Sequence, residues 1–176
     1  MSEAPTYLEP RIGWRTWRLA IDQMGVPLES WSIATHESID QLAETPPDGR
    51  YTLVSGEGTH WPGYERLEAR CGNGKDHRCP DSDCQCGVYA ARSLNILRRM
   101  GYAADPDSEN FMPDVLGELA MWGRMIENDN ILRAEFAYPK RLIVPHVNWR
   151  WAKPLRESYG CPVEIHNVFT MDEESK

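Results

Sequence analysis

The chain has 176 residues, of which 41% are hydrophobic and 26% are charged, and its formal net charge is −8. This composition excludes a wholly disordered or fibrous protein and is sufficient for one domain with its own core. The negative charge disfavours nonspecific binding to nucleic acids, whose phosphates attract basic surfaces. The sequence shows neither a secretory signal nor an apolar run long enough to span a bilayer. We therefore expect a cytoplasmic protein that does not bind membranes.

The sequence indicates a single domain between two loose ends. Residues 1–10 contain two prolines and show little periodicity, which predicts a flexible N-terminal arm. Residues 11–168 form the expected domain, because no repeat or low-complexity linker divides them. Residues 169–176 are mostly acidic and polar, so we expect a solvated C-terminal tail.

The first half of the chain predicts strands separated by turns. Mixed bulky and polar residues favour strands, whereas prolines and glycines favour turns. The expected elements are a strand at 12–19, a turn at 21–25, a strand at 28–34, a short helix at 38–43, a turn at 45–49 and a strand at 51–54.

Segment 87–100 has the strongest helical pattern in the chain. Alanines and leucines recur at spacings of three and four residues from Ala90 to Leu97, which is typical of one apolar helix face. Two arginines lie in the expected last turn, where they complement the helix dipole, and Gly101 follows. We therefore predict a helix over the whole segment.

The second half of the chain predicts a β-hairpin followed by a helix. In the second hairpin strand, Leu132, Ala134, Phe136 and Tyr138 alternate with charged residues, so we expect Arg133, Glu135 and also Arg124 on the outer surface. The expected elements are strands at 119–127 and 131–138, a strand at 142–144, a helix at 147–159 that Pro154 delays and Gly160 closes, and a strand at 161–165. The mixture predicts a compact α+β domain of short, mostly antiparallel strands with two or three helices.

Four of the five cysteines lie between positions 71 and 86, together with His77. The cytosol keeps thiols reduced, and zinc prefers four thiolate or imidazole ligands in a tetrahedron. We therefore predict a structural Zn²⁺ that pins this loop, held by Cys71, His77, Cys84 and Cys86. Cys79 is either a spare thiol or a substitute ligand, and Cys86 is expected at a helix start that favours its thiolate. The alternative is a group of buried thiols without metal.

Three motifs resemble an uncharacterised family of actinobacterial and actinobacteriophage proteins over residues 12–165. They are GWRTWR at 13–18 with Trp61-Pro62-Gly63, then Cys71…His77-x-x-Pro80…Cys84-x-Cys86-Gly87-Val88-Tyr89-Ala90, and then LAMWGR at 119–124 with RAEFAYP at 133–139. The resemblance implies the same Cys/His/Cys/Cys set of metal ligands, with Cys79 an addition of this chain. It implies no activity.

An enzymatic alternative is a thiol peptidase. The segment around Cys86-Gly87 is similar to the nucleophile segment of ubiquitin-like-protein cysteine peptidases, and a His60-Trp61 pair stands upstream. Cys86 would be the nucleophile, His60 the base, Asp76 or Asp81 the orienting acid, and Gln85 a poor candidate for the oxyanion hole. Too few residues separate His60 from Cys86 for the strands that such enzymes place between them.

Tryptophan and arginine residues interleave in two segments. Such pairs bind single-stranded nucleic acids by stacking and charge, or they concentrate binding energy at protein interfaces. The candidate binding surface consists of Trp14, Arg15, Trp17, Arg18, Trp149, Arg150 and Trp151. The competing and favoured interpretation is core aromatics with arginines stacked over their faces.

The sequence therefore favours a non-catalytic, zinc-stabilised interaction module whose partner is another protein. A closed ligand set, the lack of a convergent acid–base group and the acidic composition all point in this direction. The resemblance adds a phage or actinobacterial regulatory protein as the expected context. The alternatives are a nucleic-acid-binding protein and the Cys86 peptidase.

Overall fold

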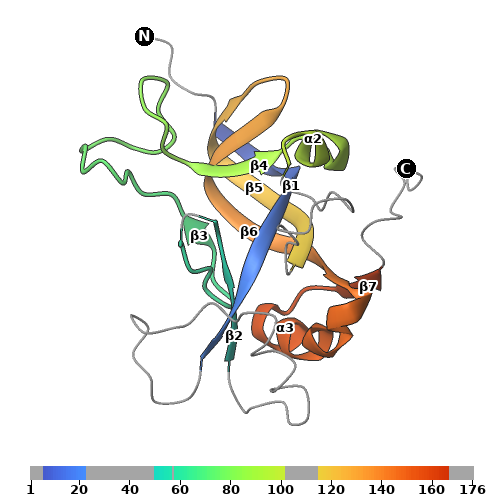
Figure 1. Ribbon diagram of the computed structural model, residues 1–176. Helices are drawn as coiled ribbons and strands as arrows, with labels where there is room; N and C mark the ends of the chain where they lie inside the picture. Colours follow the sequence, from blue (N-terminus) through green and yellow to red (C-terminus); the bar gives the residue numbers. More distant parts are fainter. Residues whose placement is uncertain (1–5, 23–49, 57, 102–114, 167–176) are drawn as a thin grey trace.

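The computed structural model describes residues 6–22, 50–56, 58–101 and 115–166 (Figure 1). In these ranges, seven strands form one mixed sheet, which carries two short α-helices and a 3-10 helix. The α+β class is thus confirmed in outline. The predictions for 28–34, 38–43, 45–49 and the tail at 169–176 lie outside the described residues.

Three of the strands are much longer than predicted: β1, β5 and β6 have 17, 13 and 15 residues. In chain order the elements are β1 (Thr6–Asp22), β2 (Arg50–Val54), β3 (Leu67–Glu68), β4 (Val88–Ala91), α2 (Leu94–Arg99), β5 (Val115–Glu127), β6 (Ile131–Pro145), the 3-10 helix η2 (His146–Trp151), α3 (Ala152–Tyr159) and β7 (Val163–His166).

Four strands close into a ring. β1 pairs with β5, β5 with β6, β6 with β4, and β4 with β1, all antiparallel. The ring closes at a tight contact, because a Cβ atom at Gly13 would lie 2.5 Å from that of Ala90. Only glycine lets the backbones of β1 and β4 approach so closely. The remaining strands extend from this ring: β2 from β1, and β3 and β7 from β6, with β7 parallel to β6 (Figure 1).

The main core lies inside the ring and under α3. Trp17 packs edge-on against Trp61, with ring centroids 5.4 Å apart. Tyr159 of α3 is also buried, and its hydroxyl accepts a hydrogen bond from the backbone N–H of Leu53 at 2.7 Å and donates one to the carbonyl of Trp61 at 2.9 Å. Burial raises the pKa of Tyr159 far above its ordinary value, so the hydroxyl keeps its proton. One phenol therefore joins α3 to β2.

Replacing Tyr159 with phenylalanine is expected to lower the free energy of unfolding by about 2–3 kcal/mol, because two buried backbone groups lose their partner. Denaturant unfolding checks this value. Tyr64→Phe is the matched control: its hydroxyl also bonds a backbone carbonyl, that of Glu157, but the side chain is 70% exposed. A loss below about 0.5 kcal/mol for Tyr159→Phe would contradict the assignment.

The predicted helix at 87–100 is wrong in its first half. Residues 88–91 are strand β4, which lies between β1 and β6, and the helix comprises only Leu94–Arg99. Ser93 caps it, since its Oγ accepts a hydrogen bond from the N–H of Ile96. Of the alanines that suggested a helix face, Ala90 lies in the core of the ring against Gly13, and Ala91 packs with Leu94 and Leu97 of α2. Cys86 consequently precedes a strand, and the helix-dipole argument for its thiolate does not hold.

The predicted hairpin is confirmed. β5 and β6 pair on either side of residues 128–130, and the predicted strand at 142–144 is the continuation of β6. Helix α3 ends at Gly160 as predicted, with Pro154 in its first turn and the 3-10 helix η2 before it. The last strand is β7, two residues further along than predicted.

Residues 6–10, predicted as part of a flexible N-terminal arm, belong to a strand. β1 begins at Thr6, which pairs with Arg124, and the register then shifts between Tyr7 and Arg11. Segment 6–10 lacks strand periodicity of its own. It is a strand because the end of β5 offers backbone partners. The residue pattern of 119–127 predicts a strand by itself. The pattern of residues 1–10 does not predict that 6–10 pair with the end of that strand.

Candidate metal centre

The four predicted metal ligands converge. The donor atoms of Cys71, His77, Cys84 and Cys86 all lie within 4.8 Å of one another. The sulfurs of Cys71 and Cys84 are 3.7 Å apart, and Cys86 Sγ lies 3.3 Å from His77 Nε2. In a zinc tetrahedron with Zn–S bonds of about 2.3 Å, ligand atoms are separated by about 3.5–3.8 Å. The four residues are therefore placed to hold one metal ion.

Tight turns bring these donors together. The N–H of Gly74 bonds the carbonyl of Cys71 at 3.3 Å, and the N–H of Cys84 bonds the carbonyl of Asp81 at 3.3 Å. The Asp81 carboxylate also accepts the N–H of Asp83 at 2.9 Å, as in an Asx turn. Cys84 and Cys86 are buried, and no cysteine is in a disulfide. Reduced thiols in a shielded pocket suit metal coordination.

Arg133 fastens the loop to the sheet. It lies in β6, and its Nη1 donates to the carbonyls of Cys84 at 2.6 Å and Cys86 at 3.4 Å. The sequence placed this arginine on an outer surface. It instead reaches the backbone of two metal-site cysteines. This contact was not predictable from local patterns, because 49 positions separate Arg133 from Cys84.

An ion pair between a half-exposed arginine and a buried carboxylate provides a second anchor. Arg78, between His77 and Cys79, forms two parallel hydrogen bonds with Glu135, at 2.6 Å from Nε and 2.7 Å from Nη2. Glu135 is only 6% exposed and also accepts the backbone N–H of Arg124 at 3.0 Å. The predicted outer position of Glu135 is therefore wrong.

The pKa of Glu135 depends on burial, which raises it, and on hydrogen bonds and positive charges, which lower it. Burial opposes its ionisation, but the hydrogen bonds from Arg78 and the Arg124 backbone, with the charges of both arginines, outweigh burial and leave the pKa below its ordinary value. Glu135 is therefore a carboxylate at neutral pH and completes a charge-assisted link between the metal loop and β6.

A β-bulge lies opposite Glu135. The β5–β6 register shifts between Trp122 and Met125, where β5 contains one extra residue, and Gly123 there has φ +81°. The bulge supplies the Arg124 N–H that Glu135 accepts, and the metal loop covers Glu135 through Arg78. Of the face predicted to be buried, Leu132 and Ala134 are buried, while Phe136 and Tyr138 are half-buried.

Gly123→Ala is expected to lower the free energy of unfolding by about 2 kcal/mol or more. The new Cβ would lie 2.8 Å from Glu135 Oε2 and 2.8 Å from the Phe136 ring, at a positive φ. Thermal unfolding measures the loss, and Gly72→Ala is the control, because nothing lies within 4 Å of a Cβ at Gly72. Equal unfolding temperatures for the two variants would contradict this role of the bulge.

Cys79 lies beside the four residues without belonging to them. It is buried in the same sulfur cluster as Cys84 and Cys86. Burial, a hydrogen bond with Cys86 and the electrostatic influence of the neighbouring cysteines raise the pKa of Cys79 to about 12. The sulfur of Cys79 is not among the four donor atoms that lie within 4.8 Å of one another.

The peptidase alternative requires His60 next to Cys86. The imidazole next to Cys86 is instead that of His77, which is itself one of the four donors. His60 forms an isolated β-bridge with Val54 at the end of β2, and the neighbouring Trp61 is buried in the core. Cys86 is thus placed for coordination.

The two Trp/Arg segments belong to different parts of the structure. Trp17 and Trp151 are buried, and Trp14 is half-buried with the Arg141 guanidinium 5.8 Å from its ring centroid. Arg15 lies over Trp61 at 5.5 Å and bonds the carbonyl of Tyr89. The favoured interpretation, core aromatics with stacked arginines, describes these contacts.

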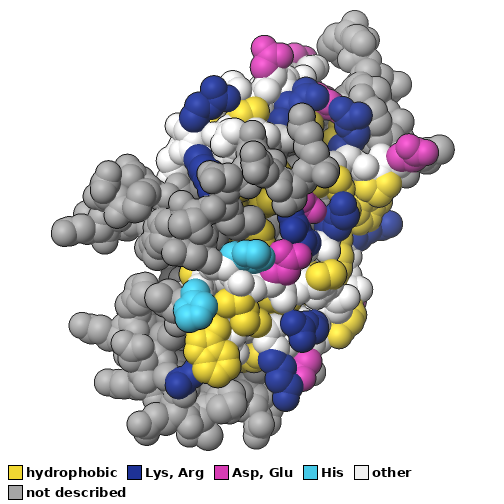
Figure 2. All heavy atoms as spheres, turned by 90° about the vertical axis from the view of Figure 1, so that its right-hand side faces the viewer, with side chains coloured by type: hydrophobic (Ala, Val, Ile, Leu, Met, Phe, Trp, Pro, Cys, Tyr) yellow, Lys and Arg dark blue, Asp and Glu magenta, His cyan; other side chains and the backbone are white. Residues whose placement is uncertain are grey.

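The exposed members of the set are Arg18, Trp149 and Arg150; Trp149 is 54% exposed, and the Arg150 guanidinium lies 5.6 Å from its ring centroid. In the described part of the face drawn in Figure 2, acidic side chains lie among the basic ones. This pattern lacks the single basic patch typical of nucleic-acid-binding surfaces.

No family model matches the chain, and neither a curated protein nor a solved structure matches it. Among the described residues, no helix is long and apolar enough to cross a membrane. The geometry of the metal centre is therefore the main ground for the function proposed below.

Proposed function

We propose that the four residues hold one structural Zn²⁺ and that the chain is a non-catalytic cytoplasmic module that binds another protein. The observation that carries the proposal is the convergence of three sulfurs and one imidazole nitrogen within 4.8 Å. The resemblance described above makes an actinobacterial or phage regulatory protein the proposed context.

The donor set favours zinc over other common ions. Three thiolates and an imidazole are soft or intermediate ligands, whereas magnesium and calcium select oxygen donors. Zinc takes such a set as a tetrahedron, and four protein ligands leave no position for a reactive water. A closed site of this kind stabilises structure. It does not supply a nucleophile.

Two anchors support a structural role. Arg133 and the Arg78–Glu135 pair attach the metal loop to β6, so an ion in the loop would stiffen a surface supported by the ring of strands. A rigid surface loses little conformational entropy on binding a partner. The net charge of −8 favours a protein partner over a nucleic acid.

Site-specific photo-crosslinking tests the proposal. A photoreactive amino acid replaces the exposed Gln85, next to the metal ligands, in the full chain expressed in its host cells; the same amino acid at the exposed Lys153 of α3 is the control. We expect one recurrent protein adduct at position 85, lost when Cys84 is replaced by alanine. Adducts that nuclease removes would support a nucleic-acid partner, and the absence of any adduct would contradict a binding module.

A further inference from the structure

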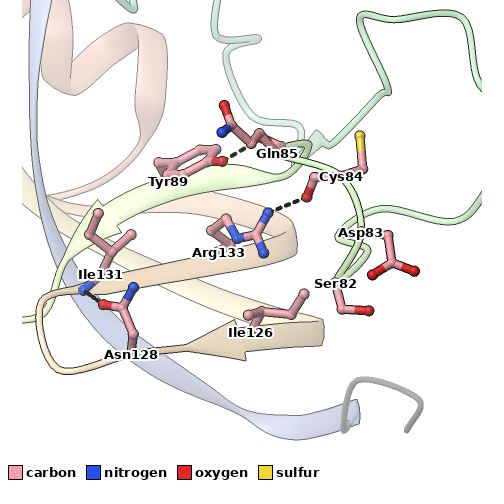
Figure 3. A pocket seen from close by; sticks show the side chains of 9 residues that line it. All are labelled: Ser82, Asp83, Cys84, Gln85, Tyr89, Ile126, Asn128, Ile131 and Arg133. Carbon is pink, nitrogen blue, oxygen red and sulfur yellow. Dashed lines mark hydrogen bonds between the residues drawn. The ribbon is translucent and has the colours of Figure 1, made fainter. Parts of the chain in front are cut away.

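A groove lies between the metal loop and the β5–β6 hairpin, with a volume of about 620 Å³. Its walls come from three segments: the loop, strand β4 and the end of the hairpin (Figure 3). The residues that line the groove include Asp83, Tyr89, Ile126, Asn128, Ile131 and Arg133. We propose that this groove binds a peptide segment in which a carboxylate stands next to an apolar side chain. The inference rests on the proposed function, because it specifies the partner's chemistry.

Arg133 supplies the recognition of the carboxylate. Its Nη1 is occupied by the carbonyls of Cys84 and Cys86, and the guanidinium lies 5.8 Å from the ring centroid of Tyr89. Nε and Nη2 make no hydrogen bond with a described residue. Figure 3 shows the second terminal nitrogen directed into the groove, on the side of Ile126. A guanidinium with one edge held and N–H groups left over is preorganised for a carboxylate, which it binds in a planar, charge-assisted arrangement.

The rest of the groove suits a peptide. Ile126, Ile131 and the ring of Tyr89 form a half-buried apolar surface for one side chain. The Asn128 Oδ1 accepts the N–H groups of Asn130 and Ile131, which leaves its Nδ2 to donate to a peptide carbonyl. A mixed surface with few, well-placed polar groups is typical of binding pockets.

Asp83 weakens the binding of any anion in the groove. It stands on the opposite rim, across from Arg133 (Figure 3), and contributes a negative charge. The attraction to Arg133 and the repulsion from Asp83 both grow with the charge of the anion, so Asp83 lowers anion affinity without selecting one anion. A peptide is favoured over a nucleic acid because the groove pairs Arg133 with an apolar surface and the net charge of the chain is −8.

The metal centre controls this groove. Figure 3 shows the sulfur of Cys84 directed away from Arg133, while the Cys84 carbonyl holds Arg133. The same sulfur lies within 4.8 Å of the other three donor atoms. One residue thus takes part in both sites. If the loop detaches from the metal, the groove loses one wall and Arg133 loses its orientation.

An NMR titration of the zinc-loaded full chain tests the proposal. The probes are N-acetyl-leucine, which has a free carboxylate, and N-acetyl-leucine amide, which does not. We expect the carboxylate to shift the Arg133 Nε–H and Asn128 side-chain resonances saturably, with a Kd of order 1 mM, and the amide to leave them unshifted. No shift with the carboxylate, or equal shifts with both probes, would overturn the proposal.

Three variants sharpen the test without removing a metal ligand. Arg133→Lys is expected to weaken carboxylate binding about tenfold, because an ammonium lacks the planar fork. Ile126→Glu is expected to abolish binding, and Asp83→Asn to tighten it about two- to threefold. Zinc content is measured for each, and Trp149→Glu, outside the groove, is the control and should bind as the unmodified chain does. Unchanged affinity in Ile126→Glu and Asp83→Asn would overturn the proposal.

The two proposals fail in different ways. If position 85 crosslinks to a protein but N-acetyl-leucine produces no shift, the binding module stands and the carboxylate groove is wrong. If the probe binds but no adduct forms in cells, the groove is a carboxylate site and the protein-binding module is wrong.

Discussion

Replacing Cys84 with alanine is expected to weaken zinc binding by more than about a hundredfold. Loss of an outer partner of a metal ligand already costs about 10–100-fold, and Cys84 supplies a donor atom itself. At fixed free zinc, a hundredfold loss of affinity removes about 2.7 kcal/mol of stability. Competition with a chromophoric chelator measures the affinity, and thermal unfolding measures the stability.

Cys79→Ala is the matched control for this variant. Both thiols are buried in the same sulfur cluster, but only Cys84 is one of the four converging donors. We expect Cys79→Ala to keep one zinc ion per chain with an affinity within about tenfold of that of the unmodified chain. The reverse order of the two affinities would show that Cys79 is a ligand and Cys84 is not.

Replacing Glu135 with glutamine is expected to lower the free energy of unfolding by about 2 kcal/mol and zinc affinity about tenfold. The variant weakens the paired hydrogen bonds to Arg78, which sits next to His77, a metal-site residue. Glu118→Gln is the control, because Glu118 pairs with Arg141 and Lys140 elsewhere on the ring. We expect it to leave zinc affinity unchanged.

The stability difference between wild type and Glu135→Gln should depend on pH. The pKa of Glu135 in the folded chain lies below its ordinary value of 4.5, so the carboxylate contributes stability above that pH. The contribution is lost as the pH falls below 4.5 and through the folded pKa. Comparing both chains with zinc at each pH separates this effect from protonation of the thiolates. A difference that grows in acid would contradict the ion pair.

The hairpin and the α3–β7 region were predictable because their signals are local. Alternating residues on either side of 128–130 identify two strands, and Pro154 and Gly160 mark the two ends of one helix. The four metal-site residues were predictable for a similar reason. Their chemistry is rare and they lie close together in the chain.

The errors arise where tertiary contacts override local patterns. Ala90 and Ala91 fit a helix face by spacing, but they lie in β4, where Ala90 fits against Gly13 of β1 and Ala91 packs under α2. Glu135 follows the alternation of an exposed face, but Arg78 of the metal loop and the bulge next to Gly123 cover it. Neither the ring closure nor the bulge is encoded within a window of a few residues.

The partners of the metal loop were not predictable for the same reason. Arg78 meets Glu135 across 57 positions, and Arg133 meets Cys84 across 49. Arginine and glutamate are common surface residues, so their presence carried no signal.

Native mass spectrometry of the freshly purified chain is the most direct single measurement. The proposed functions depend on a divalent ion that joins positions 71, 77, 84 and 86. We therefore expect the mass of one chain plus one zinc ion, less the protons that the thiols release. The same spectrum for His77→Ala should show metal-free chains as the main species. Metal-free wild-type protein with all thiols reduced, purified without chelators, would contradict the account.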